Sequence, residues 1–125
     1  MPRIEHFAIY ADDTTALADF YVALLGMRVV KKGTGDPPGY FLADGHGGAI
    51  ELIGRPAGAA VNQRWVCHLA FWSDDMPALE ARVQALGLVI EHDTRVDEDA
   101  MQTFFFNDPA GNRCQIVWRR EPLGA

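Results

Sequence analysis

Two histidines and two oxygen-bearing side chains recur at matching positions in the two halves of this chain. His6 in Ile-Glu-His-Phe-Ala-Ile-Tyr recurs as His68 in Val-Cys-His-Leu-Ala-Phe-Trp, at an offset of 68 − 6 = 62. Glu51 recurs as Gln115, at an offset of 115 − 51 = 64. Two half-domains related by a pseudo-two-fold axis would bring these four side chains together. Four convergent nitrogen and oxygen ligands suit a divalent metal ion such as Zn, Ni, Mn, Co or Fe.

The spacing of apolar residues predicts the same order of elements in both halves. Alternating apolar stretches indicate strands, acidic pairs indicate helix N-caps, and Gly, Pro, Asn and Asp indicate turns. In the first half we expect strands at residues 4–10, 27–32, 40–43 and 49–53, and a helix from the Asp12-Asp13 cap to Gly26. In the second half we expect strands at residues 65–72, 88–91, 102–106 and 113–119, and a helix from the Asp74-Asp75 cap to Gly87.

These elements predict a single α+β domain built of two tandem βαβββ modules with pseudo-two-fold symmetry. Its curved mixed sheet would form a half-barrel around a metal or ligand cavity. The expected boundaries are module 1 at 1–53, a Gly-, Ala- and Pro-rich linker at 54–62, module 2 at 63–120 and a short tail at 121–125. Half of a 125-residue chain buries too little surface to be stable alone, so the modules should share an interface.

Strand alternation predicts which side chains face the cavity, because successive residues point to opposite faces of a sheet. One face of each of four strands is apolar and suits a covering helix: those at residues 4–10, 49–53, 65–72 and 113–119. The other face carries the two histidines, Glu51 and Gln115. By the same parity Tyr10, Trp72 and Arg113 share this face, as substrate contacts or as packing residues. At least one ring of Phe104-Phe105-Phe106 should also point toward the cavity.

These side chains also have simpler interpretations that involve no metal. A histidine within a strand is more often a packed, hydrogen-bonded residue than a ligand, but the repeated position favours ligation for His6 and His68. Gln115 has an equal alternative, as a relic position that hydrogen-bonds a neighbour. His46 and His92 lie in turn or edge contexts and are expected to be solvated.

The chain resembles the vicinal oxygen chelate superfamily, which includes glyoxalase I, extradiol dioxygenases and bleomycin-resistance proteins. The resemblance lies in the doubled βαβββ plan, the strand-borne histidines, the Gly-Gly-Ala-Ile-Glu-Leu-Ile strand and the ending Asp-Pro-Ala-Gly-Asn-Arg-Cys-Gln-Ile-Val. It implies one divalent metal ion bound by His6, Glu51, His68 and Gln115. It also implies a homodimer, in which the site forms within one chain or across two.

Gln115 departs from the glutamate that is usual at its position in metal-dependent members. An amide cannot act as a base, so Glu51 is the only ligand carboxylate left to move a proton. The resemblance therefore favours a metal-dependent lyase or isomerase, similar to lactoylglutathione lyase, that polarises vicinal oxygens of a small substrate. The alternatives are a metal-free small-molecule or antibiotic-binding protein of the bleomycin-resistance type and, third, an extradiol-type dioxygenase.

Composition narrows the partners of the protein. A net charge of −6 without a basic run argues against nucleic acid and anionic membranes. No apolar run reaches membrane-spanning length, and the first residues lack the features of a signal peptide, so we expect a cytoplasmic protein. The absence of phosphate-loop, nucleophile-elbow and helical His-Glu-x-x-His motifs makes nucleotide-binding and hydrolase functions poor matches. A small-molecule substrate remains the expected partner.

Overall fold

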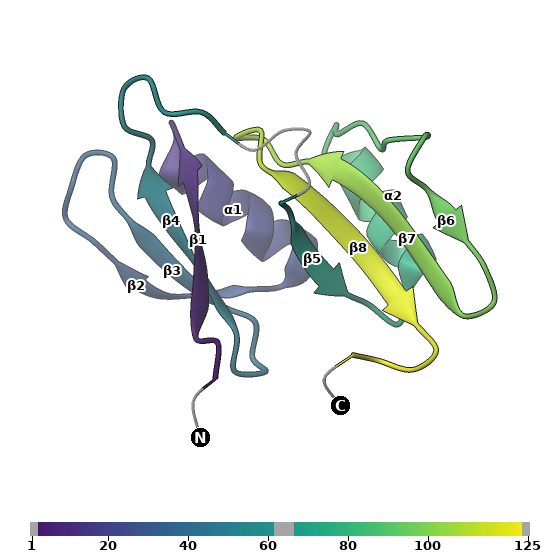
Figure 1. Cartoon of the computed structure of the whole chain (residues 1–125). Coiled ribbons are helices and arrows are strands. Elements are labelled where there is room, and N and C mark those ends of the chain that lie inside the picture. Colours follow the sequence, from purple (N-terminus) through teal and green to yellow (C-terminus); the bar gives the residue numbers. More distant parts are fainter. Residues whose placement is uncertain (1–2, 62–66, 124–125) are drawn as a thin grey trace. The chain divides into compact units, whose positions relative to one another are not determined.

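The computed structural model describes residues 3–61 and 67–123, and it divides the chain into two compact units. The first unit contains residues 1–61 and the second residues 62–125. Each unit has a four-stranded sheet and one helix (Figure 1). The order βαβββ occurs twice, which confirms the predicted tandem plan.

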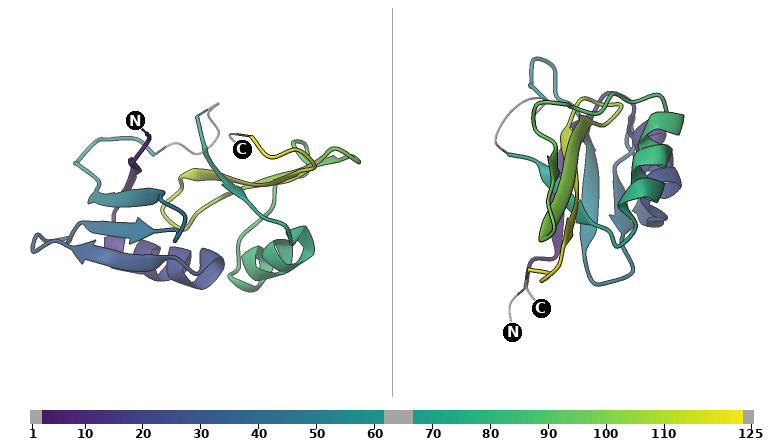
Figure 2. Two further views of the ribbon diagram at one scale, coloured as in Figure 1. Left: turned by 90° about the horizontal axis from the view of Figure 1, so that it is seen from below. Right: turned by 90° about the vertical axis from the view of Figure 1, so that its right-hand side faces the viewer.

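In the first unit the sheet order is β1-β4-β3-β2. Strands β1 and β4 are parallel, and the other neighbours are antiparallel. Helix α1 covers one face of this sheet (Figure 2). The elements are β1 (His6–Ala11), α1 (Thr14–Leu25), β2 (Arg28–Lys32), β3 (Tyr40–Ala43) and β4 (Ala49–Gly54).

The second unit repeats this arrangement with the order β5-β8-β7-β6, and β5 and β8 form its parallel pair. Helix α2 packs against β8. The elements are β5 (Leu69–Trp72), α2 (Met76–Ala85), β6 (Val96–Asp97), β7 (Met101–Asn107) and β8 (Arg113–Arg119).

Both helices begin at the predicted caps. Asp13 Oδ1 accepts from the backbone N–H of Ala16 at 2.9 Å, and Asp75 Oδ1 accepts from that of Ala78 at 3.1 Å. These bonds satisfy a first-turn N–H that has no partner within the helix. Helix α1 ends at Gly26, whose φ of 66° is left-handed, as predicted for a glycine cap.

The alternation predicted for the strands agrees with the observed burial. The helix-covered face of the first sheet is buried at Ile9, Leu42 and Leu52, and that of the second at Phe104 and Ile116. Phe7 is an exception, at 54% exposure, because it lies near the start of the edge strand β1. The opposite faces carry the candidate site residues.

Two equivalent turns set the register of the central strands. In the turn from β3 to β4, Asp44 Oδ1 accepts from the backbone N–H of His46 at 2.7 Å and of Gly48 at 3.0 Å. In the turn from β7 to β8, Asp108 Oδ1 accepts from the N–H of Ala110 and of Asn112, both at 2.9 Å. The two aspartates are 64 residues apart and accept the same pattern of backbone hydrogen bonds, so both hairpins have the same register.

One predicted strand was wrong. Residues 88–91 form only an isolated bridge, between Ile90 and Phe106, and the strand that pairs with β7 is β6. The chain turns away after Glu91, whose carboxylate accepts hydrogen bonds from Thr94 and from the guanidinium of Arg113. These side-chain contacts favour a turn at residues 92–94 over a continuous strand.

Several of the predicted ranges include residues outside the description. The strand expected at 65–72 is described only from residue 67, and it begins at Leu69, so His68 lies just before it. Residue 62 of the expected linker, residues 63–66 of the second module and residues 124–125 of the tail also lie outside the description. Among residues 3–61 and 67–123, no helix has the length and apolar character needed to cross a membrane.

Candidate functional site

His6 and Glu51 form a pair on the open face of the first sheet. Strand β1 carries His6, and the neighbouring strand β4 carries Glu51, which is in register with Ala8. His6 Nε2 lies 3.5 Å from Glu51 Oε1, and both side chains are about one third exposed or less. The parallel pairing of β1 with β4 thus brings together two of the predicted ligands.

The other ring nitrogen of His6 also faces a carboxylate. Nδ1 lies 2.8 Å from Oε1 of Glu5, an exposed side chain. A neutral imidazole has one N–H and one lone pair, so donation to Glu5 leaves the Nε2 lone pair facing Glu51. In this tautomer the Nε2 lone pair and Glu51 Oε1 are two acceptors 3.5 Å apart, an arrangement that suits a shared metal ion.

His68 and Gln115 form the equivalent pair in the second unit. Gln115 is on β8 in register with Ala70 of β5, two residues after His68. His68 Nε2 lies 3.0 Å from Gln115 Oε1. Gln115 Nε2 donates to Thr103 Oγ1 at 2.7 Å, and Thr103 Oγ1 donates to the carbonyl oxygen of Ile116 at 2.8 Å.

A phenylalanine contacts the imidazole in each unit. Phe41 lies edge-to-face with His6 at a centroid distance of 5.3 Å, and Phe105 does so with His68 at 5.0 Å. Phe41 is in register with Glu51, and Phe105 with Gln115. The ring predicted to face the cavity is thus Phe105, since Phe104 and Phe106 are fully buried.

Phe41, Glu5 and Thr103 were not predicted from the sequence. Phe41 could have been found from the repeat, because 41 + 64 = 105 places it opposite Phe105. Glu5 and Thr103 have no polar counterpart at the matching position, so the repeat gives no signal for them.

Arg113 lies beside the second pair. Its guanidinium donates two hydrogen bonds of 3.1 Å to the buried carboxylate of Glu91, and it stacks over the Phe105 ring at 4.1 Å. These contacts hold Arg113 against the ring that in turn contacts His68. The other proposed substrate contacts lie on strands β1 and β5: Tyr10 is half-buried and Trp72 is 52% exposed.

The donor pairs fit a divalent ion. Two donors that bind one ion with bonds of about 2.1 Å lie about 3.0 Å apart at a right angle and about 3.4 Å apart at a tetrahedral angle. The pairs measure 3.0 and 3.5 Å. Each unit contains one such pair of an imidazole and an oxygen, and within the described residues no group of three or more His, Cys, Asp or Glu side chains comes together.

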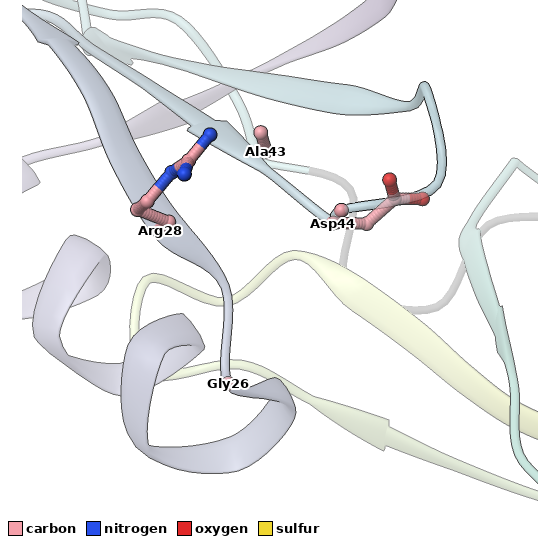
Figure 3. Close-up of a pocket in the computed structure, with 5 residues that line it drawn as sticks. Gly26, Arg28, Ala43 and Asp44 are labelled. Carbon is pink, nitrogen blue, oxygen red and sulfur yellow. The ribbon is translucent and has the colours of Figure 1, made fainter.

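A hollow of about 310 Å³ also lies in the first unit, lined by Gly26, Arg28, Ala43, Asp44 and Gly45 (Figure 3). None of the predicted site residues lines it. The carboxylate of Asp44 already accepts hydrogen bonds from its own turn. The contacts of Asp44 therefore stabilise the hairpin turn and do not indicate a binding site.

The family is decided by a comparison with known domain families. Residues 3–116 match the family described as the Glyoxalase/Bleomycin resistance protein/Dioxygenase superfamily. The chain belongs to this superfamily. The match includes both donor pairs and extends from before β1 into β8, and it confirms the resemblance found in the sequence. No curated protein matches the chain significantly.

Solved structures of this superfamily fold align with nearly the whole chain. TnmS3, an antibiotic-binding protein from Streptomyces sp. CB03234, is 19% identical, with 95% of this chain and 97% of that chain covered and a TM-score of 0.75. Oxidase ChaP-H2 is 22% identical, with coverages of 100% and 98% and a TM-score of 0.78. FosX from Listeria monocytogenes, a fosfomycin resistance protein in complex with Mn(II) and sulfate, is 15% identical, with coverages of 98% and 95% and a TM-score of 0.77. At these identities the likeness establishes the fold.

Proposed function

We propose that this protein is a metal-dependent lyase or isomerase that moves a proton next to a carbonyl group of a small substrate. The observation that carries the proposal is the repeated pair, in which an imidazole Nε2 lies 3.0 or 3.5 Å from a side-chain oxygen in each unit. His6, Glu51, His68 and Gln115 would hold one divalent ion of Zn, Ni, Mn, Co or Fe. The superfamily membership and the Mn(II) in FosX support a metal of this class.

Within this proposal the side chains have distinct roles. A bound ion would supply a Lewis acid for the vicinal oxygens of the substrate. Glu51 is the carboxylate among the four, so it is the group that takes and returns the proton. Gln115 supplies a neutral carbonyl oxygen. Tyr10, Trp72 and Arg113 are proposed to contact the substrate on the same strand faces.

The experiment is a metal titration of the purified protein by calorimetry, with the single variants His6→Ala, Glu51→Ala, His68→Ala and Gln115→Ala. We expect one ion per chain in the wild type and weaker binding in each variant. His46→Ala and His92→Ala are matched controls, because both histidines are exposed and outside the pairs. A wild type that binds none of the five ions would refute the proposal.

Activity is tested on the metal-loaded protein, beginning with thiol adducts of 2-oxoaldehydes, the substrate class of a lactoylglutathione lyase. Glu51→Gln keeps an oxygen ligand but removes the base. We expect it to lower kcat by about 10²- to 10⁴-fold with a smaller loss of metal affinity. Equal losses in Glu51→Gln and Gln115→Ala would argue that Glu51 is only a ligand.

We further propose a cytoplasmic homodimer, in which the two pairs meet either within one chain or across two. The two arrangements are distinguished by mixing the His6→Ala and His68→Ala variants, refolding them together and measuring metal binding. If the site forms across two chains, a mixed dimer has one intact set of ligands and recovers metal binding. If the site forms within one chain, every chain in the mixture lacks a ligand and no binding returns.

A second candidate function is a metal-free binding protein for a small molecule. It is favoured by the second pair, where Gln115 is hydrogen-bonded to both His68 and Thr103. The structure of TnmS3, described as antibiotic-binding, shows that this fold is compatible with such a role. This function predicts that His6→Ala and His68→Ala leave ligand affinity unchanged.

A further inference from the structure

The hydroxyl of Thr103 lies behind Gln115, on the side away from His68. Thr103 is on β7, one strand from Gln115 on β8, and it is only 4% exposed. Its oxygen takes part in two hydrogen bonds, one with Gln115 Nε2 at 2.7 Å and one with the carbonyl oxygen of Ile116 at 2.8 Å. A buried hydroxyl thus connects a backbone carbonyl to the side-chain amide of the proposed ligand.

The chemistry of these partners fixes the direction of every bond. The carbonyl oxygen of Ile116 can only accept, so the single hydroxyl proton of Thr103 is donated to it. The Thr103 oxygen can then only accept from Gln115, which requires the NH₂ group of the amide on that side. The amide carbonyl oxygen must therefore face His68, where it lies 3.0 Å from Nε2.

The first unit supports the same interpretation by contrast. The position equivalent to Thr103 is Gly39, since 103 − 64 = 39, and it has no hydroxyl. Its partner there is Glu51, a carboxylate with two equivalent acceptor oxygens, which presents an oxygen in either orientation. An orienting hydroxyl is present where the ligand is an amide and absent where the ligand is a carboxylate.

We propose that Thr103 is a positioning residue that locks the Gln115 amide so that its carbonyl oxygen, and not its NH₂ group, faces His68 and the metal. The part of this inference that concerns metal rests on the proposed function. An amide that turned over would direct N–H groups at the ion, and these cannot ligate it. Thr103 thus allows glutamine to serve in place of glutamate.

The test is a metal titration of wild type, Thr103→Val, Thr103→Ser, Gln115→Glu and the double variant Thr103→Val/Gln115→Glu. Valine has nearly the shape of threonine but no hydroxyl, and serine keeps the hydroxyl. We expect Thr103→Val to weaken metal binding by about 10- to 100-fold, as for other supports of metal ligands. Thr103→Ser should stay within about threefold of the wild type.

The double variant separates orientation from general damage. A carboxylate at position 115 needs no orientation, so Thr103→Val should change the affinity of Gln115→Glu by less than about threefold. If Thr103→Val weakens binding equally in both backgrounds, its effect is structural and the proposal is overturned. A Thr103→Val protein that binds as tightly as wild type overturns it as well.

A second readout needs no metal and separates this inference from the proposed function. In the metal-free protein an amide oxygen that faces His68 requires the ring proton on Nε2, which the ¹⁵N chemical shifts of the imidazole report. We expect this tautomer in wild type and Thr103→Ser, and a reduced population of it in Thr103→Val. If the wild type binds no ion, the proposed function fails, and the NMR result alone decides whether Thr103 orients the amide. A tautomer that does not respond to Thr103→Val overturns the inference.

Discussion

His6 has a carboxylate oxygen close to each of its ring nitrogens, Glu5 at 2.8 Å and Glu51 at 3.5 Å. His68 has instead a neutral amide oxygen at Nε2. The negative charge of the proposed metal site is therefore concentrated in the first unit. A carboxylate at the second nitrogen of a ligating imidazole fixes the tautomer and raises the basicity of the ligand.

Removal of the Glu5 charge should weaken metal binding without removing a ligand. We expect Glu5→Gln to lower the affinity by about 10-fold, at the low end of the effects of residues that hydrogen-bond a metal ligand, because the Glu5 side chain is 79% exposed and water screens its charge. Isothermal titration with the metal measures this change. Glu98→Gln removes an exposed carboxylate elsewhere, and it should leave the affinity unchanged. An equal loss of metal affinity in both variants would show that Glu5 acts only through the net charge of the protein.

At the residue scale, the sequence indicated the side chains that recur in both halves but not the side chains that hydrogen-bond them. His6, Glu51, His68 and Gln115 were predicted because their positions repeat, and strand alternation gave them a common face. Thr103 supports Gln115 from the neighbouring strand. Its role depends on the register of β7 with β8, which places Thr103 and Gln115 two positions apart across the ladder.

At the scale of the elements, the two aspartate-bound turns determine which residues face each other across the central strands. Each turn joins strands on which a phenylalanine is in register with a ligand oxygen residue. The turns differ in burial, since Asp108 is 3% exposed and Asp44 is exposed. Their contributions to stability should differ accordingly.

We expect Asp108→Ala to lower the free energy of unfolding by about 2–4 kcal/mol, because it removes the acceptor of the buried Asn112 N–H and of the part-buried Ala110 N–H. Asp44→Ala removes the same bonds in an exposed loop, where water replaces the acceptor, so the expected loss is about 1 kcal/mol or less. Urea denaturation of both variants provides the comparison. A similar loss of unfolding free energy in both variants would show that burial does not determine how much each turn contributes to stability.

The contact between α2 and the turn at residues 92–95 should respond to pH. Arg95 donates two hydrogen bonds to Glu80, and these bonds, with the charge of Arg95, hold the pKa of Glu80 below its usual value of 4.5. A lowered folded-state pKa stabilises the fold above pH 4.5, and this contribution is lost as the pH falls through the folded-state value.

Glu80→Gln should therefore lower the free energy of unfolding at pH 7 by less than about 1 kcal/mol, because both partners are partly exposed. The difference between variant and wild type should disappear in acid, below the folded-state pKa. Denaturant titrations at neutral and acidic pH measure it. A difference that persists in acid would assign the effect to packing.

Elements were predictable where a single periodicity extends over the whole segment. Both helices and the strands β3 and β8 were predicted at or within a few residues of their observed ends. The strand expected at 88–91 failed because Arg113, distant in sequence, holds the Glu91 carboxylate and favours a turn. Such a contact between side chains far apart in the chain leaves no local signal.

At the scale of the whole molecule, the proposed ion should stabilise the folded chain by mass action. At a free metal concentration of 100 times Kd the expected gain is about 2.7 kcal/mol, or roughly 10 °C in Tm. Differential scanning calorimetry with the metal and with a chelator measures the shift. The double variant His6→Ala/His68→Ala should show no shift, and an equal shift in that variant would place the metal elsewhere.

Each unit has its own sheet, its own helix cap and its own buried core, and each donor pair is assembled by strand register inside one unit. Because the core and the donor pair lie on different faces of each sheet, selection can act on folding and on chemistry separately. Donors on the open face of one sheet can drift to other residues while the helix-covered face keeps that unit folded. Glu51 and Gln115 differ in this way at matching positions of the two units.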